Sequence, residues 1–158
     1  MTVKIKQSVI SSYGQPPECR QGCQIFNYND RIYVLGGASN NLRHTVEVMD
    51  LKNSHWDRFE IEGYRRRSFH NVLEYGTDKV MLIGGFREAA PHDKKRLALS
   101  LEIIDLEKRT IKALALPNLK KVEPRYAQAS VFIDVGILLI CGGRTLEKFK
   151  KDCFLVDI

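Results

Sequence analysis

One short pattern occurs three times in this chain: an apolar run that ends in a pair of glycines. It covers residues 32–37 (IYVLGG), 80–85 (VMLIGG) and 137–143 (ILLICGG). A continuous β-branched and aliphatic run of this length is typical of a strand buried on both faces. A closing glycine pair indicates a bend where a neighbouring backbone or ring comes close. The pattern therefore predicts an all-β chain built from three copies of one unit, with glycines that serve the structure.

Each glycine pair stands in the same sequence context. An arginine, at Arg20, Arg67 and Arg125, precedes the first glycine of each pair by 16, 17 and 17 residues. An aspartate closes the following strand pattern, and an apolar residue comes six positions after the first two of these aspartates, Trp56 in the first unit and Ile111 in the second. The residues that define the motif are Gly36, Gly37, Asp50, Trp56, Gly84, Gly85, Asp105, Gly142, Gly143 and Asp157.

The strand patterns around these motifs predict where each unit begins and ends. Four short strands joined by turns fit into residues 20–61 and again into residues 67–114, whereas residues 125–158 hold three and lack the fourth. Residues 3–7 alternate apolar and basic side chains, which predicts an additional half-exposed outer strand. The whole chain, 1–158, is therefore expected to be a single domain with the strands of three four-stranded antiparallel units in permuted order.

This combination of motifs resembles the kelch repeat over residues 20–158. The first glycines lie 48 and then 58 residues apart, near the period of about 50 residues of kelch-type propeller blades. The resemblance implies an all-β, kelch-type β-propeller with three blades, which is a half or partial propeller. The chain departs from the pattern in the second unit, which lacks the tryptophan and has a longer loop at residues 86–99, and in the third, which lacks its last strand.

Three blades leave a ring open, because typical propellers close with about four to eight blades. Two explanations remain open at this point. Two chains could join head to tail as a homodimer with a six-bladed ring, in which residues 3–7 of each chain complete a blade of the other. Alternatively, the polypeptide is part of a longer propeller, or another chain supplies the missing blades.

Hydropathy and cysteine usage predict a location in the cell. The sequence has no run of 18 apolar residues, and lysines interrupt its N-terminal stretch, so we expect no membrane contact and no signal peptide. The cysteines do not form the paired CxxC spacing of zinc sites, so we expect reduced thiols in a cytosolic compartment. They are Cys19, Cys23, Cys141 and Cys153. We therefore predict a cytoplasmic protein, with cytoskeletal association as one option.

The sequence contains no pattern of catalytic or metal-binding residues. Its four histidines, which show no HxxxH or HExxH spacing, are His44, His55, His70 and His92. No serine stands in a GxSxG context. His70 falls within a first-strand pattern and is expected to be a hydrogen-bonded core or edge residue. We therefore predict a non-enzymatic protein without catalytic residues, cofactor or metal.

The net charge of +6 is expected to concentrate on one face. In a four-stranded blade, the loops between second and third strands and the loops between blades lie on the same side. The arginines and lysines in these loops, which we predict to bind a partner, are Arg43, Arg65, Arg66, Arg67, Arg87, Lys94, Lys95, Arg96 and Arg144. Arginine binds carboxylates through two parallel hydrogen bonds. The chain is therefore predicted to be a protein-interaction or scaffold module that binds an acidic protein segment.

Other interpretations of the same residues stay open. Any single exposed lysine is more simply a solvated charge, and Arg67 and Arg125 could instead serve the structure through hydrogen bonds between blades. A nucleic-acid contact is disfavoured, because most aromatic residues fall within strand patterns rather than beside the arginines, which leaves no platform for base stacking. A further alternative is a structural subunit that completes a larger propeller or complex.

Overall fold

The computed structural model describes residues 10–89, 96–98, 100–116, 119 and 122–158. This part of the chain is all-β and contains no α-helix, and its sheets are open rather than closed on themselves. The predicted all-β class is therefore confirmed, whereas the predicted strand at residues 3–7 lies outside the described residues. No helix in the described part is long and apolar enough to cross a membrane.

Three sheets follow one another along the chain. The first has the order β1-β5-β4-β3-β2, in which β1 runs parallel to β5 and the other neighbours are antiparallel. Its strands are β1 (Tyr13–Gly14), β2 (Gln21–Tyr28), β3 (Arg31–Ala38), β4 (Thr45–Asp50) and β5 (His55–Glu60). Strands β2 to β5 fall within the range 20–61 predicted for the first unit.

The second and third sheets are antiparallel and also fall within the predicted ranges. The second, ordered β11-β10-β8-β7, contains β7 (Asn71–Tyr75), β8 (Lys79–Ile83), β10 (Leu101–Asp105) and β11 (Thr110–Ala113). The third, ordered β12-β13-β14, contains β12 (Ala129–Asp134), β13 (Ile137–Cys141) and β14 (Cys153–Asp157). A small separate sheet pairs β6 (Arg67–Ser68) with β9 (Phe86–Arg87). The predicted first strand of the second unit is thus interrupted between Ser68 and Asn71.

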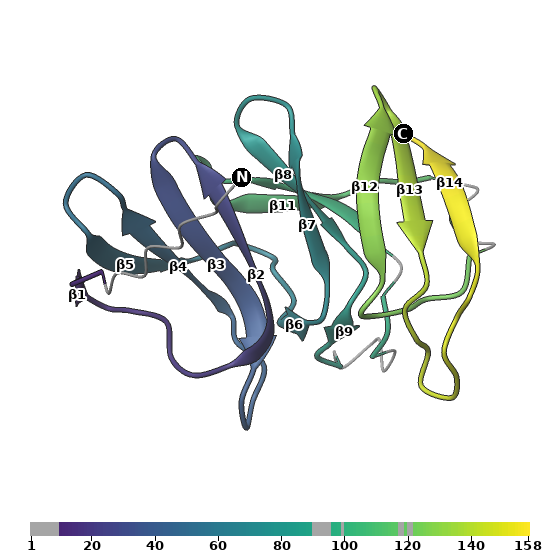
Figure 1. Ribbon diagram of the computed structural model, residues 1–158, viewed down its shortest axis with the longest axis horizontal. Helices are drawn as coiled ribbons and strands as arrows, with labels where there is room; N and C mark the ends of the chain where they lie inside the picture. Colours follow the sequence, from purple (N-terminus) through teal and green to yellow (C-terminus); the bar gives the residue numbers. More distant parts are fainter. Residues whose placement is uncertain (1–9, 90–95, 99, 117–118, 120–121) are drawn as a thin grey trace, which may run out of the picture.

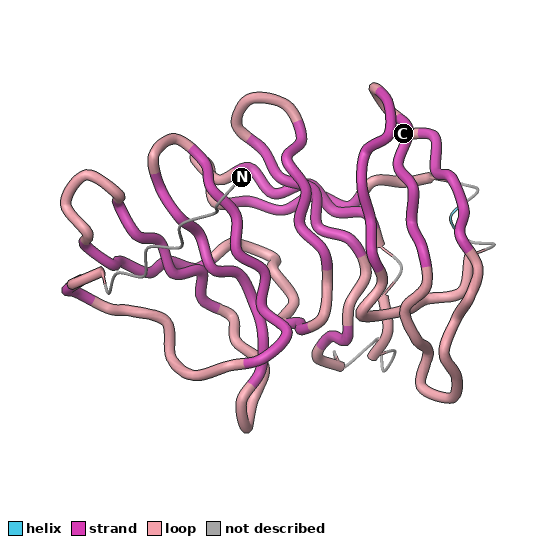
Figure 2. The backbone as a smooth tube through the Cα atoms, in the orientation of Figure 1, coloured by secondary structure: helices cyan, strands magenta, loops and turns pink. Residues whose placement is uncertain are grey.

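The three sheets stand side by side in chain order (Figure 1). The hairpin turns β2–β3, β7–β8 and β12–β13 lie along one edge of the row, and the longer loops lie along the opposite edge (Figure 2). We call these edges the turn face and the loop face. The loop face comprises the described residues within 38–44, 62–69, 84–100, 122–127 and 142–152.

The core consists of two apolar layers, one on each side of the second sheet. Side chains alternate between the two faces of a strand, so Leu82 of β8 packs against the first sheet beside Leu35. Its neighbours Met81 and Ile83 pack against the third sheet beside Ile140. All of these side chains are buried. The run of apolar residues in β8 therefore forms a strand covered on both faces, as predicted.

The first glycine of a pair allows the next sheet to approach closely. Gly36 has φ +68°, and a Cβ atom there would lie 2.5 Å from the Arg67 carbonyl oxygen and 2.6 Å from Cε1 of His70. Gly84 has φ +63°, and a Cβ atom would lie 2.7 Å from Nε2 of Gln128. Only glycine combines this backbone conformation with so little space, so these two positions require glycine for the approach of the next sheet.

Backbone hydrogen bonds also link the three units in one strip. Phe69 N–H donates to the Gly22 carbonyl (2.7 Å), and Ala127 N–H donates to the Phe69 carbonyl (2.8 Å). Each of these residues stands two positions after a leading arginine and has positive φ, at 68°, 54° and 53°. The sheets are therefore joined by the same bond at equivalent positions.

The cysteines differ from expectation. Cys141 and Cys153 lie opposite one another on β13 and β14 and form a disulfide, whereas Cys19 and Cys23 are free. The prediction that all four are reduced thiols is therefore wrong for two of them. Directly opposite residues in an antiparallel pair bring their Cβ atoms close. The pairing of Cys141 with Cys153 therefore follows from strand register, which a search for CxxC spacing cannot detect.

Candidate functional site

The leading arginines belong to the fold. Arg67 is 0% exposed, and it donates to a carboxylate oxygen of Glu102 (2.6 Å) and to the Gly84 carbonyl (3.3 Å). Equivalent ion pairs hold the first and third units, Arg20–Glu47 at 2.8 Å and Arg125–Asp152 at 2.7 Å. Arg67 therefore lies outside the accessible basic surface expected from the sequence. The Arg67 side chain bonds to its own unit and to the Arg65 carbonyl. The Arg125 carbonyl, in contrast, accepts a hydrogen bond from Gly85 N–H of the second unit at 3.1 Å, so the expected bond between units is found at Arg125 and not at the Arg67 side chain.

The carboxylate partners of these arginines were not found from the sequence. Glu47 and Glu102 stand three residues before the aspartate that closes the strand, whereas Asp152 stands five before Asp157. Because the spacing changes in the third unit, the sequence pattern does not reveal that the arginine–carboxylate pair is repeated. The hydrogen bond from Arg125 lowers the pKa of Asp152 below its ordinary value, so the pair is charged at neutral pH.

Three other predicted arginines converge on one groove of the loop face. Arg66, Arg87 and Arg96 line a cavity of about 450 Å³ together with Glu88, and residues 38–42 supply other lining residues. The three come from the loop before β6, from β9 and from the loop before β10. We call this cavity the arginine groove. The structure thus brings together arginines that lie up to 30 positions apart in sequence.

The ion pair between Arg66 and Glu88 in the groove is exposed and long. Arg66 Nε lies 3.5 Å from a carboxylate oxygen of Glu88, and the two side chains are 41% and 50% exposed. Arg65 donates to the Glu88 carbonyl at 2.8 Å. Exposed pairs of this kind contribute about 0–1 kcal/mol. An incoming carboxylate could therefore replace Glu88 at little energetic cost.

The remaining predicted residues lie around this groove or outside the described part. Arg43 forms an ion pair with Glu18 (2.6 Å) and lines a smaller cavity of about 240 Å³ that Arg66 also lines. Arg144 lies further along the loop face, beside the third sheet. Lys94 and Lys95 fall outside the described residues, so their placement stays a prediction.

Aromatic rings accompany the arginines on the loop face. The Arg96 guanidinium lies 6.0 Å from the centroid of Phe86, and that of Arg144 lies 5.6 Å from Tyr126 and 4.9 Å from Phe149. The rings of Phe86 and Tyr126 are 6.0 Å apart. The expectation that the aromatic residues lie away from the arginines is therefore wrong here. The available signal was position, because Phe86 directly follows a glycine pair and Tyr126 directly follows a leading arginine.

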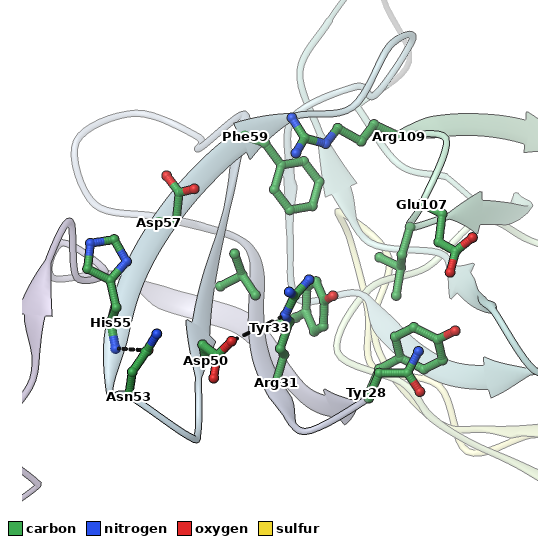
Figure 3. Close-up of a pocket in the computed structure, with 13 residues that line it drawn as sticks. Tyr28, Arg31, Tyr33, Asp50, Asn53, His55, Asp57, Phe59, Glu107 and Arg109 are labelled. Atoms are coloured by element: carbon green, nitrogen blue, oxygen red, sulfur yellow. Dashed lines mark hydrogen bonds and ion pairs between the residues drawn. The ribbon is translucent and has the colours of Figure 1, made fainter.

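A second cavity, of about 420 Å³, opens on the turn face between the first and second sheets. Figure 3 shows Arg31 directed toward Asp50, and the Arg109 guanidinium lies over Phe59 at 4.6 Å from the ring centroid. Glu107 also lines the cavity. Its arginines are thus mixed with the acidic side chains of Asp50, Asp57 and Glu107.

Buried polar groups between the first two sheets are a further feature. His70 is buried, and neither ring nitrogen has a hydrogen-bond partner among the described residues. Burial and the nearby Arg67 lower the pKa of His70 to about 3. Of the two positions expected for His70, core or edge, the structure has the core position, but the expected hydrogen bond is not found among the described residues. Across the described residues, no cluster of three or more His, Cys, Asp or Glu could hold a metal ion.

Comparisons with known proteins give distant similarities. No protein-family model matches the chain. Acyl-CoA-binding domain-containing protein 4 of Arabidopsis thaliana is 24% identical over 143 residues, which cover 88% of this chain and 20% of that protein. Acyl-CoA-binding domain-containing protein 5 of the same plant is 24% identical over 152 residues, 94% of this chain and 22% of that protein. The chain thus spans about a fifth of the length of these curated relatives.

Proposed function

We propose that the three sheets are kelch-type propeller blades and that the chain is a non-enzymatic interaction module, which binds an acidic protein segment in the arginine groove. The repeat supports the first part, because each unit has the same leading arginine, glycine pair and a carboxylate that is ion-paired with the arginine. The strip of equivalent hydrogen bonds through Gly22, Phe69 and Ala127 fits a regular rotation from blade to blade.

The observation that carries the binding proposal is the convergence of Arg66, Arg87 and Arg96 on one groove. A guanidinium presents a planar fork of donors that matches a carboxylate. A chain segment with several acidic side chains would place them between these arginines in turn. A single exposed charge pair contributes about 0–1 kcal/mol, so micromolar affinity, about 8 kcal/mol, requires several of these contacts to form together and to be shielded from water in the groove.

A nucleic acid is the second candidate for the same face. The rings of Phe86, Tyr126 and Phe149, which lie beside Arg96 and Arg144, favour it, because bases stack on aromatic rings and on guanidinium planes. We rank it second because the rings of Phe86 and Tyr126 are already packed against each other and against Arg96 and Arg144. The arginines that line the groove, in contrast, match the carboxylates of an acidic segment. Acyl-CoA binding, which the relatives' names mention, is not proposed for this chain, which spans only about a fifth of those proteins.

Cytoplasmic localisation stays part of the proposal. It requires that the Cys141–Cys153 disulfide can be reduced in the cell, because a reducing cytosol does not maintain most structural disulfides. A free-thiol count on protein extracted under acid quenching would test this. Four alkylated cysteines support the location, and two contradict it.

The two candidate ligands are distinguished by fluorescence anisotropy with the wild-type chain. The probes are a labelled glutamate-rich peptide and a labelled single-stranded oligonucleotide of equal length, each titrated at low salt and at about 0.15 M salt. We expect micromolar binding of the peptide at the higher salt and at least about tenfold weaker binding of the oligonucleotide. Tighter binding of the oligonucleotide would favour the second candidate, and the absence of binding to both would contradict each of them.

A further inference from the structure

The outward face of the third sheet, which points away from the second sheet, carries exposed apolar side chains. Val131 and Ile133 of β12 are 49% and 54% exposed, and Leu155 of β14 is 61% exposed. The intervening residue Phe132 packs inward against the second core layer. Figure 1 shows this sheet at one end of the row. The face is thus a strip of apolar surface with no sheet of the described chain beyond it.

The strand register identifies the equivalent positions in the first and second sheets, where a following sheet covers them. In the second sheet, Ile83 lies opposite Leu101, and both are fully buried against the third sheet. In the third sheet, the equivalent opposed positions are Cys141 and Cys153. The first sheet has Leu35 opposite Val46 there, and both are buried against the second sheet. This face therefore corresponds to one that a following sheet covers in both other units.

The space beside the glycine pair of the third unit is also not filled by a following unit of the described chain. Gly142 has φ +64°, as the first glycines of the other units do, but the nearest atom to a Cβ placed there is the Lys150 carbonyl oxygen at 3.7 Å. At Gly36 and Gly84 that space is filled by the following unit. The third unit thus keeps the backbone conformation that admits a neighbour.

The strip of backbone hydrogen bonds also stops at this face. The carbonyls of Gly22 and Phe69 each accept a bond from the following unit, whereas the Ala127 carbonyl accepts none from the described part of the chain. A donor equivalent to the Phe69 and Ala127 N–H groups is present in the first unit, at Gly22, two residues after Arg20. The Gly22 N–H of the first unit and the Ala127 carbonyl of the third unit are therefore the donor and acceptor positions of one more bond of this kind.

We infer that the outward face of the third sheet docks the first sheet of a second copy of this chain. The outward face of the first sheet presents Ile25, which is 67% exposed and stands at the position of Val72 in the second unit. Val72 packs against the first sheet. The contact between copies would repeat a contact that the chain makes twice within itself, and it is head to tail. The inference rests on the blade-like stacking of the proposed function, but not on ligand binding in the arginine groove.

The experiment measures the mass of the full chain in solution by sedimentation equilibrium, over a wide range of concentration. We expect reversible association from the 18.1 kDa chain to twice that mass. Val131→Lys should weaken association by at least about tenfold, because a charge would be buried at the contact. The control is Val135→Lys, since Val135 is 96% exposed in the β12–β13 turn, off the sheet face. Circular dichroism should show all variants folded.

A mixing experiment tests which faces meet. Ile25→Lys alone should weaken association as Val131→Lys does, yet a mixture of the two variants should form a complex, because each retains one intact face. Failure of the mixture to associate, or a wild-type chain that stays monomeric at all concentrations, would overturn the inference. Binding of the glutamate-rich peptide by Val131→Lys should equal that of the wild type, so failure of the groove proposal can be told apart from failure of this one.

Discussion

At the scale of single residues, His70 and Gln128 occupy the same place in successive units, three residues after a leading arginine. Gln128 Nε2 donates to the Ile83 carbonyl at 2.9 Å. His70 makes no such bond within the described part of the chain, and its pKa is lowered to about 3 by burial and by Arg67. A histidine in this position costs stability in acid that a glutamine would not.

His70→Gln should therefore reduce the pH dependence of stability. The unfolded chain binds a proton at this histidine below its ordinary pKa of 6.5, whereas the folded chain does not bind it until about pH 3. The free energy of unfolding should thus fall as the pH drops from 6.5 toward 3, by about 1.4 kcal/mol per pH unit at most. Urea denaturation at pH 7, 6 and 5 should show a shallower decline for the variant, and parallel declines would contradict the buried neutral imidazole.

Alanine at two equivalent glycines would separate backbone strain from close packing. Gly36 and Gly142 have nearly the same φ, +68° and +64°, but only Gly36 has the following unit against it. Both alanines incur the strain of positive φ, about 1 kcal/mol, and Gly36→Ala should cost at least about 2 kcal/mol more through overpacking. Thermal or urea denaturation at concentrations where the chain is monomeric measures the difference. Equal costs would mean that the sheets are further apart than the structure shows.

At the scale of elements, Arg20 and Glu47 tie the start of β2 to β4. Their side chains are 3% and 1% exposed and share two hydrogen bonds of 2.8 and 2.9 Å. Arg20→Met should cost about 3–5 kcal/mol, because it leaves a buried carboxylate unpaired, and the double variant with Glu47→Leu should recover much of that loss. Urea denaturation of the single and double variants tests this. A double variant less stable than Arg20→Met would contradict the pairing.

The strands were largely predictable from the sequence, and the contacts between their ends were not. The burial of residues 80–83 was predictable from their composition alone, because a strand covered on both faces must be apolar throughout. Contacts of Arg67 with Glu102 and of Cys141 with Cys153 depend on strand register. The rings of Phe86 in β9 and Tyr126 in the loop before β12, 40 residues apart in sequence, meet because both segments reach the loop face. Local sequence patterns do not predict that these two segments lie close together.

At the scale of the whole molecule, the loop face and the turn face differ in how their arginines are used. Among the described residues, the arginine groove gathers Arg66, Arg87 and Arg96 with the carboxylate of Glu88. In the turn-face cavity, Arg31 faces Asp50 at 3.8 Å, and Asp57 and Glu107 also line the space. An acidic segment is therefore expected on the loop face. The basic net charge favours its approach from any side, so a test must separate local recognition from overall charge.

Two double variants of equal net charge make that separation. Arg66→Glu with Arg96→Glu changes the groove, and Arg31→Glu with Arg109→Glu changes the turn-face cavity, while both lower the net charge of +6 by the same amount. The measurement is the affinity of each for the glutamate-rich peptide at about 0.15 M salt. We expect the groove variant to bind at least about tenfold more weakly than the wild type, and the turn-face variant to remain within about twofold. Equal losses in the two variants would show that binding follows net charge alone and would contradict a binding site in the arginine groove.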